Sequence, residues 1–476
     1  MADAESLQAD ICVIGAGAGG LTVAAGGAQM GASVILLERH HMGGDCLNTG
    51  CIPSKSLLAA AHAAHRVRVA GRLGIATSPP QVDMAKVHQH VHQVIAQIAP
   101  HDSQERFEQM GVKVIRQEGR FVSPHEVQAG QYSIKARRFV IATGSSPNLP
   151  PLPGLASIPF FTNETIFDLQ TLPEHLLVLG GGPIGLELAQ AFLRLGSRVT
   201  LLARSGLLKR DDPQLVEELA TLLQAEGMTL LKEVQFQQAS QTGQHITLEI
   251  THQGEHRTIT GSHLLVATGR EANVSSLNLE AANIHYSRQG IQVDGRLRTT
   301  NPHIFALGDV AGPHLFTHMA GYQAGIVLQN ILFRLPVKTN YQAVPWVTFT
   351  DPELAQVGMT EATAHANGLP FTILQKPFLE NDRARAEGVA YGRIKLVAGP
   401  KGRLLGASAL GPLAGEIIQP WIVAITHKLS IRQMSQWISP YPTFSEINKG
   451  VAGSYFTPTL YGTRTKKLVK LLAKLG

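Results

Sequence analysis

The sequence predicts an α/β fold in which two similar parallel-sheet units are followed by a C-terminal α+β domain. Two observations indicate the repeat: an apolar run, a GxGxxG segment and a helical run occur twice in that order, and an ATG segment ends a further apolar run twice. The third observation is a change of composition after about residue 345, where short strands mix with helices and no glycine-rich loop is present. The chain has 476 residues, enough for several domains.

The first unit opens with the apolar run 9–14, which is typical of a buried strand, and GAGAGG comes next at 15–20. A helix over 21–30 and a second strand over 33–38 are expected after it, and Glu38 ends that strand. The glycines allow a tight turn whose backbone amides and helix N-terminus face a pyrophosphate, and the acid can accept hydrogen bonds from a ribose. The unit is therefore predicted to be a Rossmann-like dinucleotide-binding domain.

The second unit repeats the pattern with an apolar run at 175–179, GGGPIG at 180–185, a helix to 195 and a strand over 198–203. Its strand ends at Ala203 and Arg204 in place of an acid, with Lys209 and Arg210 close behind. A carboxylate there would bind a free ribose 2′-hydroxyl, whereas an arginine pair favours a 2′-phosphate. We predict NADPH over NADH, the alternative being a solvated basic loop.

Between these units lies GGDCLNTGCIPSK at 43–55, which brings Cys46 and Cys51 close to a helix expected over 54–69. Four intervening residues allow a disulfide, and a helix starting just after Pro53 would favour a thiolate at Cys51. Two unrelated buried cysteines or half of a zinc site are the alternatives, but no second cysteine pair or histidine set lies nearby. We predict a redox-active pair, and we expect the third cysteine, Cys12, to be a core residue.

Composition excludes several classes of protein. No apolar run is long enough for a membrane helix and the first ten residues are polar and acidic, so we expect a cytoplasmic protein. The net charge of +6 suits anionic cofactors, and in the absence of a nucleic-acid motif we expect no nucleic-acid partner. Six histidines are spaced irregularly without an accompanying acid or cysteine cluster, so we predict packing or surface roles and no metal site; they stand at 62, 65, 88, 90, 92 and 101.

With these segments placed, the chain resembles the pyridine nucleotide–disulfide oxidoreductase family, which includes dihydrolipoamide dehydrogenase, glutathione reductase and mercuric reductase. The similarity spans nearly the whole chain and rests on the segments above, on ALGDVA at 306–311 and on VTFTDPELAQVGMTE at 347–361. It implies an FAD-binding domain over 1–150 and 271–344, an NAD(P)H-binding domain over 151–270, and a dimerisation domain over 345–476 in a homodimer. The implied FAD contacts are Gly15, Gly17, Gly20, Glu38, Arg39, Gly44, Thr143, Gly144 and Asp309, and the NADPH contacts are Gly180, Gly182, Gly185, Arg204, Arg210 and Gly269.

The resemblance also implies roles at the cysteine pair. NADPH would reduce the flavin, the flavin would reduce the Cys46–Cys51 disulfide, and the dithiol would reduce a disulfide or another thiol-reactive acceptor. Cys51 would lie nearest the flavin and Cys46 would meet the substrate. Lys55 and Glu187 match residues that form an ion pair beside the flavin, where the lysine stabilises the reduced, anionic form.

At the C-terminal site the sequence departs from the disulfide reductases. Tyr441 stands where they carry a histidine that serves the substrate-facing thiol, while Glu446 keeps the place of its carboxylate partner. Tyrosine titrates near pH 10 and is a poor proton shuttle at neutral pH. The tyrosine and the segments 199–212 and 381–388 are more similar to mercuric reductases, but the tail 463–476 has no cysteine pair. The alternatives are an Hg/Cu-ion or quinone reductase, a dihydrolipoamide dehydrogenase-like enzyme, and an NADPH-binding flavoprotein without turnover.

In the tail 463–476, lysines alternate with leucines in a pattern that predicts a basic amphipathic helix. Such a helix can contact an anionic membrane surface. A solvated helix, or one that packs on the dimer, is the alternative.

Overall fold

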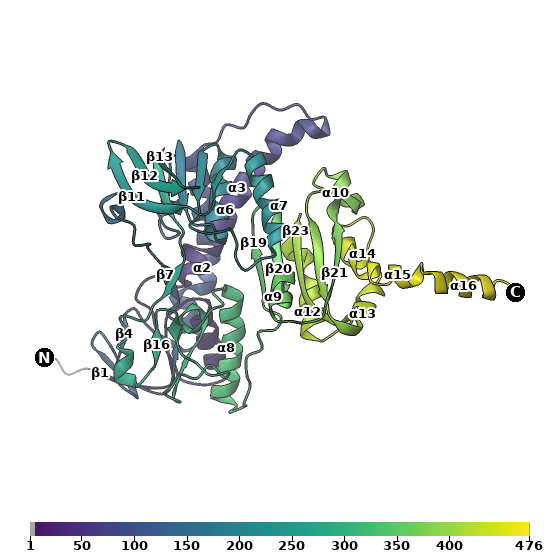
Figure 1. Ribbon diagram of the computed structural model, residues 1–476. Helices are drawn as coiled ribbons and strands as arrows, with labels where there is room; N and C mark the ends of the chain where they lie inside the picture. Colours follow the sequence, from purple (N-terminus) through teal and green to yellow (C-terminus); the bar gives the residue numbers. More distant parts are fainter. Residues whose placement is uncertain (1–4, 476) are drawn as a thin grey trace.

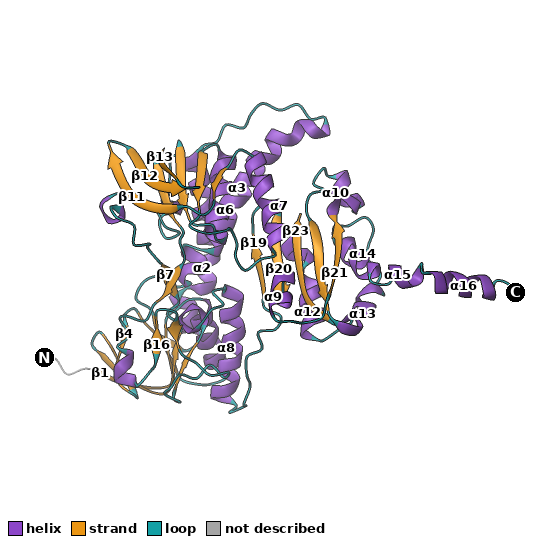
Figure 2. Ribbon diagram, viewed as in Figure 1, coloured by secondary structure: helices purple, strands orange, loops and turns teal. Residues whose placement is uncertain are grey.

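The computed structural model describes residues 5–475, which form three α/β or α+β units and a projecting C-terminal helix (Figure 1). The first unit contains β1 and α8, the second contains α6, α7 and the strands β11 to β13, and the third contains the sheet from β19 to β23. The predicted fold class is confirmed: two sheets with parallel strands and covering helices precede an antiparallel sheet with helices (Figure 2).

The first sheet has the order β3-β2-β1-β6-β5-β4, and β18 pairs with β6 although more than 160 residues separate them in the chain. Pairing is parallel from β3 to β6 and antiparallel from β6 to β4. The strands are β1 Glu5–Ile14, β2 Val34–Leu37, β3 Val112–Ile115, β4 Gly119–Ser123, β5 Glu126–Ala129, β6 Tyr132–Ile141 and β18 Ile304–Ala306. The helices are α1 Ala18–Gln29, α2 Gly44–Asn48, α3 Cys51–Val69, α4 Met84–Ile98, α5 Gln104–Gln109 and α8 Thr317–Leu332.

The second unit has a parallel sheet of order β10-β9-β8-β14 beside a three-stranded antiparallel sheet. The strand pair β7 and β15 joins it to the first unit, since the two strands stand at the points where the chain leaves and re-enters that unit. The strands are β7 Ser145–Pro147, β8 His175–Leu179, β9 Arg198–Leu202, β10 Thr229–Leu231, β11 Gln235–Thr242, β12 His245–His252, β13 Glu255–Gly261, β14 His263–Val266 and β15 Arg270–Ala272. The helices are α6 Pro183–Leu195 and α7 Pro213–Ala225. The next two strands, β16 Tyr286–Ser287 and β17 Gly290–Ile291, pair with each other and belong to the first unit (Figure 1).

The third unit is an antiparallel sheet of order β19-β20-β23-β22-β21. Its strands are β19 Pro345–Thr348, β20 Glu353–Gly358, β21 Thr372–Pro377, β22 Arg393–Ala398 and β23 Leu404–Gly411. The short helices are α9 Glu361–Ala366, α10 Asp382–Ala386, α11 Ala414–Ile417, α12 Gln419–Thr426, α13 Ile431–Ser435, α14 Glu446–Ser454 and α15 Thr457–Leu460, and α16 Thr463–Leu472 comes last. β20 and β21 were not predicted from sequence, because neither short run alternates clearly: the four central residues of β20 are all buried, and β21 ends at a proline.

Three predicted boundaries were wrong by a few residues. The strand expected over 9–14 begins at Glu5, and the helix expected from 21 begins at Ala18. The helix expected after Pro53 begins at Cys51, which puts the proline in its third position. Proline fits there because the amides of a helix's first turn need no intrahelical acceptor.

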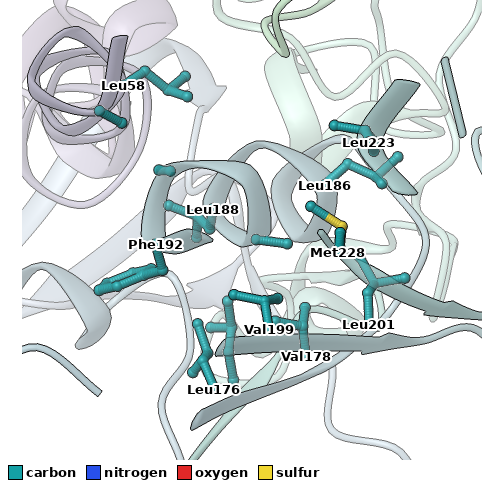
Figure 3. Packing of buried hydrophobic residues seen from close by; sticks show 14 of the residues in the cluster. Leu58, Leu176, Val178, Leu186, Leu188, Phe192, Val199, Leu201, Leu223 and Met228 are labelled. Carbon is teal, nitrogen blue, oxygen red and sulfur yellow. The ribbon is translucent and has the colours of Figure 1, made fainter. Parts of the chain in front are cut away.

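One hydrophobic cluster connects the helix after the cysteines to the second and third units. Leu58 of α3 belongs to the same buried cluster as Leu188 and Phe192 of α6 (Figure 3). Leu354 of β20 is also a member of this cluster. Phe192 is fully buried, and its replacement by alanine is expected to cost about 3–5 kcal/mol. The packing therefore fixes α3 against α6, the two helices that carry Lys55 and Glu187.

Buried ion pairs add directional contacts between the second and third units. Arg194 of α6 pairs with Glu226 at 2.6 Å and with Asp351 at 2.7 Å. Lys395 of β22 pairs with Asp212, which precedes α7, at 2.8 Å. These contacts hold the third unit in register with α6.

Among residues 5–475, no helix is long and apolar enough to cross a membrane. The last helix, α16, extends away from the third unit (Figure 1). It has no buried residue.

Candidate active site

Of the three glycines of the first GxGxxG loop, only the middle one has free space at its Cβ position. Gly15 has φ +106°, and a Cβ there would lie 2.5 Å from the carbonyl oxygen of Ala142. A Cβ on Gly20 would lie 1.9 Å from the oxygen of Gly15, so both positions require glycine. A Cβ on Gly17 meets no atom within 4 Å. The backbone at Gly17, just before α1, is thus accessible to a pyrophosphate at the helix N-terminus.

The second loop repeats this geometry. Gly180 has φ +127° with its Cβ position 2.1 Å from the oxygen of Ala267, and Gly185 would place a Cβ 2.2 Å from the oxygen of Gly180. Gly182, the N-cap of α6, again has open space. Ala142 and Ala267 begin the two ATG segments, so each ATG segment packs against the glycine-rich loop of its own unit. Gly269 ends the second segment with φ +123°.

Glu38 comes directly after β2 and connects the first loop to the next turn. Its carboxylate accepts hydrogen bonds from the amides of Ala16 at 2.8 Å and His40 at 2.7 Å. A carboxylate oxygen can accept more than one hydrogen bond, so capacity for a ribose hydroxyl remains. Glu38 lines a pocket together with Arg39 and Glu118, which pair with each other at 2.6 Å. The pocket also contains Ile14, Gly15, Leu37, Gln117, Gly119, Thr143, Asn273, Ser276 and Leu277. These residues fit the adenosine end of FAD.

Asp309 lies at the far end of the same unit, in the short 3-10 helix after β18. Ser145 donates a hydrogen bond to it at 2.6 Å, and Arg270 lies 3.9 Å away. Burial raises the pKa of Asp309 above its usual range, against the effect of the Ser145 hydrogen bond. Arg270 also pairs at 3.2 Å with Asp45, the neighbour of Cys46. The sequence analysis missed Arg270, although its place directly after the second ATG segment was a usable signal.

Thr143 and Gly144 are held by one partner, Asn273. The Thr143 hydroxyl donates to the Asn273 carbonyl at 2.8 Å, and the Asn273 backbone amide donates to the Gly144 carbonyl at 3.0 Å. The first ATG segment is therefore fixed against the segment that comes after β15.

The cysteine pair lies where α2 meets α3. Cys46 is in α2, Cys51 is the first residue of α3, and both are free thiols in this structure. The segment that carries the cysteines begins in contact with the first glycine-rich loop, since a Cβ on Gly44 would lie 2.7 Å from the Cα of Gly17. Cys12, in contrast, is fully buried in β1, as expected for a core residue.

The surroundings distinguish the two thiols. The hydrogen bond from Cys46 lowers the pKa of Cys51 to about 6, with help from Thr317 and Lys55 and against the effect of burial. The same hydrogen bond, together with burial, raises the pKa of Cys46. The Thr317 hydroxyl lies 3.3 Å from the Cys51 sulfur and belongs to the first residue of α8. Cys51 is therefore the thiolate of the reduced pair. The sequence analysis missed Thr317, which comes 266 residues later.

Lys55 and Glu187 form an ion pair of 2.8 Å. Lys55 lies one turn after Cys51 on α3, and its ammonium group is also 4.3 Å from the centre of the Phe349 ring. The second oxygen of the buried Glu187 accepts a hydrogen bond from the amide of Phe349 at 2.9 Å. The lysine is thereby held between the second and third units, beside the cysteine pair.

The end of β9 carries the basic residues. Ala203 is buried, whereas Arg204 and Lys209 are exposed. The amide of Leu208 donates to the Gly181 carbonyl at 2.9 Å, which fixes this segment beside the second glycine-rich loop. Arg210 is exposed too, but it donates to the Pro313 carbonyl at 3.1 Å. Arg204 is thus better placed than Arg210 to meet a phosphate.

Tyr441 and Glu446 lie in the third unit, where Glu446 is the first residue of α14 and Tyr441 lies five residues before it. Tyr441 is 68% exposed, and its hydroxyl donates to Asp382 of α10 at 3.0 Å. This hydrogen bond raises the pKa of Tyr441 above its usual value, so the phenol stays protonated at neutral pH. Among the described residues of one chain, neither side chain has a hydrogen bond to the cysteine pair.

The chain is similar to known oxidoreductases over almost all of its length. The family described as pyridine nucleotide-disulphide oxidoreductase matches residues 9–329, and its dimerisation domain matches residues 344–451. The mercuric reductase of Streptomyces lividans is 35% identical over 454 residues, which cover 94% of this chain and 96% of that protein. The mercuric reductase of Acidithiobacillus ferrooxidans is 36% identical over 455 residues, covering 92% and 80%.

Among solved structures, the Cu(II) complex of the HOCl-induced flavoprotein disulfide reductase RclA from Escherichia coli superimposes with a TM-score of 0.84 at 28% identity, covering 93% of this chain and 99% of that one. The glycine-rich loops, the cysteine pair and the third unit fit the same assignment. The chain therefore belongs to the pyridine nucleotide–disulphide oxidoreductase family, as a homodimeric, NAD(P)H-dependent FAD oxidoreductase with a redox-active disulfide.

Proposed function

We propose that the acceptor of this oxidoreductase is a thiol-reactive species, and that a soft metal ion such as Hg(II) or Cu(II) is preferred over a free disulfide. Bound FAD would supply a carrier that takes a hydride from NADPH and passes an electron pair to the Cys46–Cys51 disulfide. The two thiols then bind the acceptor. Thiolates are preferred ligands of soft metal ions.

The observation that carries the proposal is Tyr441 at the place of a proton-shuttling histidine. Reduction of a disulfide releases a thiolate that must be protonated, and a phenol whose pKa is raised by Asp382 is a poor group to exchange that proton at neutral pH. Reduction of a bound metal ion needs electrons only: one NADPH supplies two, for one Hg(II) or two Cu(II). The names of the mercuric reductases and of the Cu(II) complex of RclA support this acceptor class.

The test is a comparison of acceptors with the purified holoenzyme. NADPH oxidation is followed with Hg(II), Cu(II), lipoamide, glutathione disulfide, coenzyme A disulfide and quinones, each with the wild-type chain and with Tyr441→His. We expect kcat/KM for a metal ion to exceed that for every disulfide, and Tyr441→His to raise disulfide turnover. Faster turnover of a disulfide by the wild-type chain contradicts the proposal.

A non-turnover binding protein is the competing interpretation. It has no need of a thiolate at Cys51 or of the Lys55–Glu187 pair. An anaerobic titration with NADPH separates the two: a long-wavelength thiolate–flavin band that disappears in Cys51→Ser supports electron transfer, and its absence in the wild-type chain favours mere binding.

The tail supports a second, independent proposal, that α16 docks on an anionic membrane surface. Lys466, Lys470 and Lys474 recur at four-residue intervals, while the apolar side chains between them are more than half exposed: Leu468, Val469, Leu471, Leu472 and Leu475. No acidic residue is present after Glu446, so the segment attracts anionic lipid without internal compensation.

Vesicle co-sedimentation tests the docking. The full chain is expected to pellet with vesicles of phosphatidylcholine and phosphatidylserine but not with phosphatidylcholine alone, and a chain ending at Thr463 is expected to stay in solution. Lys466→Glu with Lys470→Glu should act like the truncation. Equal pelleting of the full and truncated chains contradicts docking, and a change of the dimer's stability on truncation would assign α16 to the partner subunit instead.

A further inference from the structure

Two histidines of α4 stand one helical turn apart and face the same acid. His88 and His92 are at positions i and i+4, so their side chains lie on one face of the helix, with ring centroids 4.2 Å apart. Asp168 is brought to them by the short 3-10 helix Ile166–Asp168, in the segment that leads from β7 into β8. One ligand-type atom from each of the three side chains lies within 4.8 Å of the others.

The Nε2 atom of His92 and the carboxylate of Asp168 do not form a hydrogen bond with each other. The Nε2 of His92 is shielded from solvent and has no hydrogen-bond partner among the described residues. The nearest carboxylate oxygen, that of Asp168, is 3.8 Å away. This separation is too long for a hydrogen bond but close to the roughly 3.4 Å between two ligands that each lie about 2.1 Å from one tetrahedral ion.

We propose that His88, His92 and Asp168 form a binding site for Zn²⁺, with water completing the tetrahedron. Imidazole and carboxylate are ligands of this ion, and the i, i+4 spacing on a helix is a frequent way to present two imidazoles to it. The sequence analysis expected no metal ligand among the six histidines because no acid accompanies them in sequence. Folding supplies the acid from a segment 76 positions beyond His92.

The site differs from the cysteine pair in its chemistry. It contains nitrogen and oxygen atoms and no thiolate, and its ligands come from α4 and the segment before β8. A bound ion would tie these two segments together. Asp168 is exposed, which leaves its side chain free to move towards the ion.

Equilibrium dialysis against Zn²⁺ tests the site, with the full chain in the Cys46→Ser, Cys51→Ser background so that the thiols cannot contribute. We expect one Zn²⁺ per chain. His92→Ala should weaken binding at least tenfold, and Asp168→Asn, which keeps the size of the side chain, should do the same. His90→Ala is the matched control, because His90 is exposed on the same helix outside the cluster, and it should bind as the parent does.

Co²⁺ gives a readout of the ligand set. The parent in the Cys46→Ser, Cys51→Ser background, where only the buried Cys12 remains, is expected to show visible d–d bands of a nitrogen–oxygen tetrahedral site, and these should be lost in Asp168→Asn and retained in His90→Ala. Zn²⁺ should also raise the melting temperature of the parent and of His90→Ala, but not that of His92→Ala. Equal Zn²⁺ binding by the parent and His92→Ala, or equal loss in His90→Ala and His92→Ala, overturns the proposal.

Discussion

The two dinucleotide-binding units share their backbone and differ in the segment that comes after the second strand of each. In both units, the first glycine of the loop contacts the ATG segment of the same unit, and the third glycine contacts the first. The middle glycine has free space at its Cβ position. After β2 the first unit continues through Glu38 into the cysteine loop, whereas after β9 the second continues through Ala203 into the basic segment 204–210. The same scaffold thus leads in one case to a redox pair and in the other to an exposed basic loop.

This difference indicates which residues make each unit a nucleotide site and which residues distinguish the two units. The glycines make each site a pyrophosphate site in general, because their requirement is steric and local. The residues after the strand then decide which nucleotide binds and which groups lie beside it. Substitutions at equivalent positions should therefore have equivalent structural effects but different functional ones.

The largest effect is expected from valine at the third glycine of each loop. Gly20→Val and Gly185→Val each force a side chain against a carbonyl oxygen, with Cβ positions 1.9 Å and 2.2 Å from it. Gly20→Val should yield protein without bound FAD. Gly185→Val should retain the flavin but lose NADPH oxidation, measured by flavin absorbance and by anaerobic reduction.

Alanine at the middle glycines is the matched control. A Cβ on Gly17 or Gly182 meets no protein atom within 4 Å, so each variant should keep its melting temperature while binding its nucleotide less tightly. If Gly20→Val retained flavin and Gly185→Val lost it, the assignment of the two loops would be reversed.

The next effect concerns electron transfer from NADPH to the flavin of the first unit. Lys55→Met removes the cation held by Glu187 at 2.8 Å and leaves that buried carboxylate without its partner. Loss of a hydrogen-bonded charge costs about 1.5–3 kcal/mol, which corresponds to roughly a 10- to 100-fold slower reduction of the flavin by NADPH. Stopped-flow reduction measures it. Lys86→Met, at an exposed lysine of α4, should leave the rate unchanged, and an unchanged rate in Lys55→Met would remove the lysine from the mechanism.

At the second unit the corresponding substitution is Arg204→Glu, which places an acid one residue beyond Ala203, the position equivalent to Glu38 of the first unit. The acid repels a 2′-phosphate and accepts a hydrogen bond from a 2′-hydroxyl, so the ratio of kcat/KM for NADPH over NADH should fall by roughly 10- to 100-fold. Arg210→Glu should have the smaller effect, because Arg210 donates to the Pro313 carbonyl. A wild-type chain that uses NADH as well as NADPH would contradict the preference.

The features that could be predicted from sequence are those made by short-range interactions. The loops around Gly15 and Gly180, and the cysteine pair between them, are local patterns, and a few consecutive residues are enough to predict their chemistry. The Lys55–Glu187 pair joins positions 132 apart and was accessible only through the family resemblance. Thr317 beside Cys51 and Asp168 beside His92 were missed, because nothing in the local pattern of α8 or of residues 166–168 indicates which helix each will contact.

The smallest effect is expected at Thr317, the residue of α8 whose hydroxyl lies beside the Cys51 sulfur. The pKa of Cys51 is lowered to about 6, so the thiolate is present above that pH and is lost as the pH falls through it. The thiolate–flavin band of the NADPH-reduced enzyme should accordingly have a midpoint near pH 6. Thr317→Val removes the hydroxyl at 3.3 Å, and since a neutral hydrogen bond contributes about 1 kcal/mol, the midpoint should rise by less than about one pH unit. Thr317→Ser, which keeps the hydroxyl, should leave it in place. A midpoint that stays near pH 6 in Thr317→Val would assign the low pKa of Cys51 to Cys46, Lys55 and the start of α3 alone.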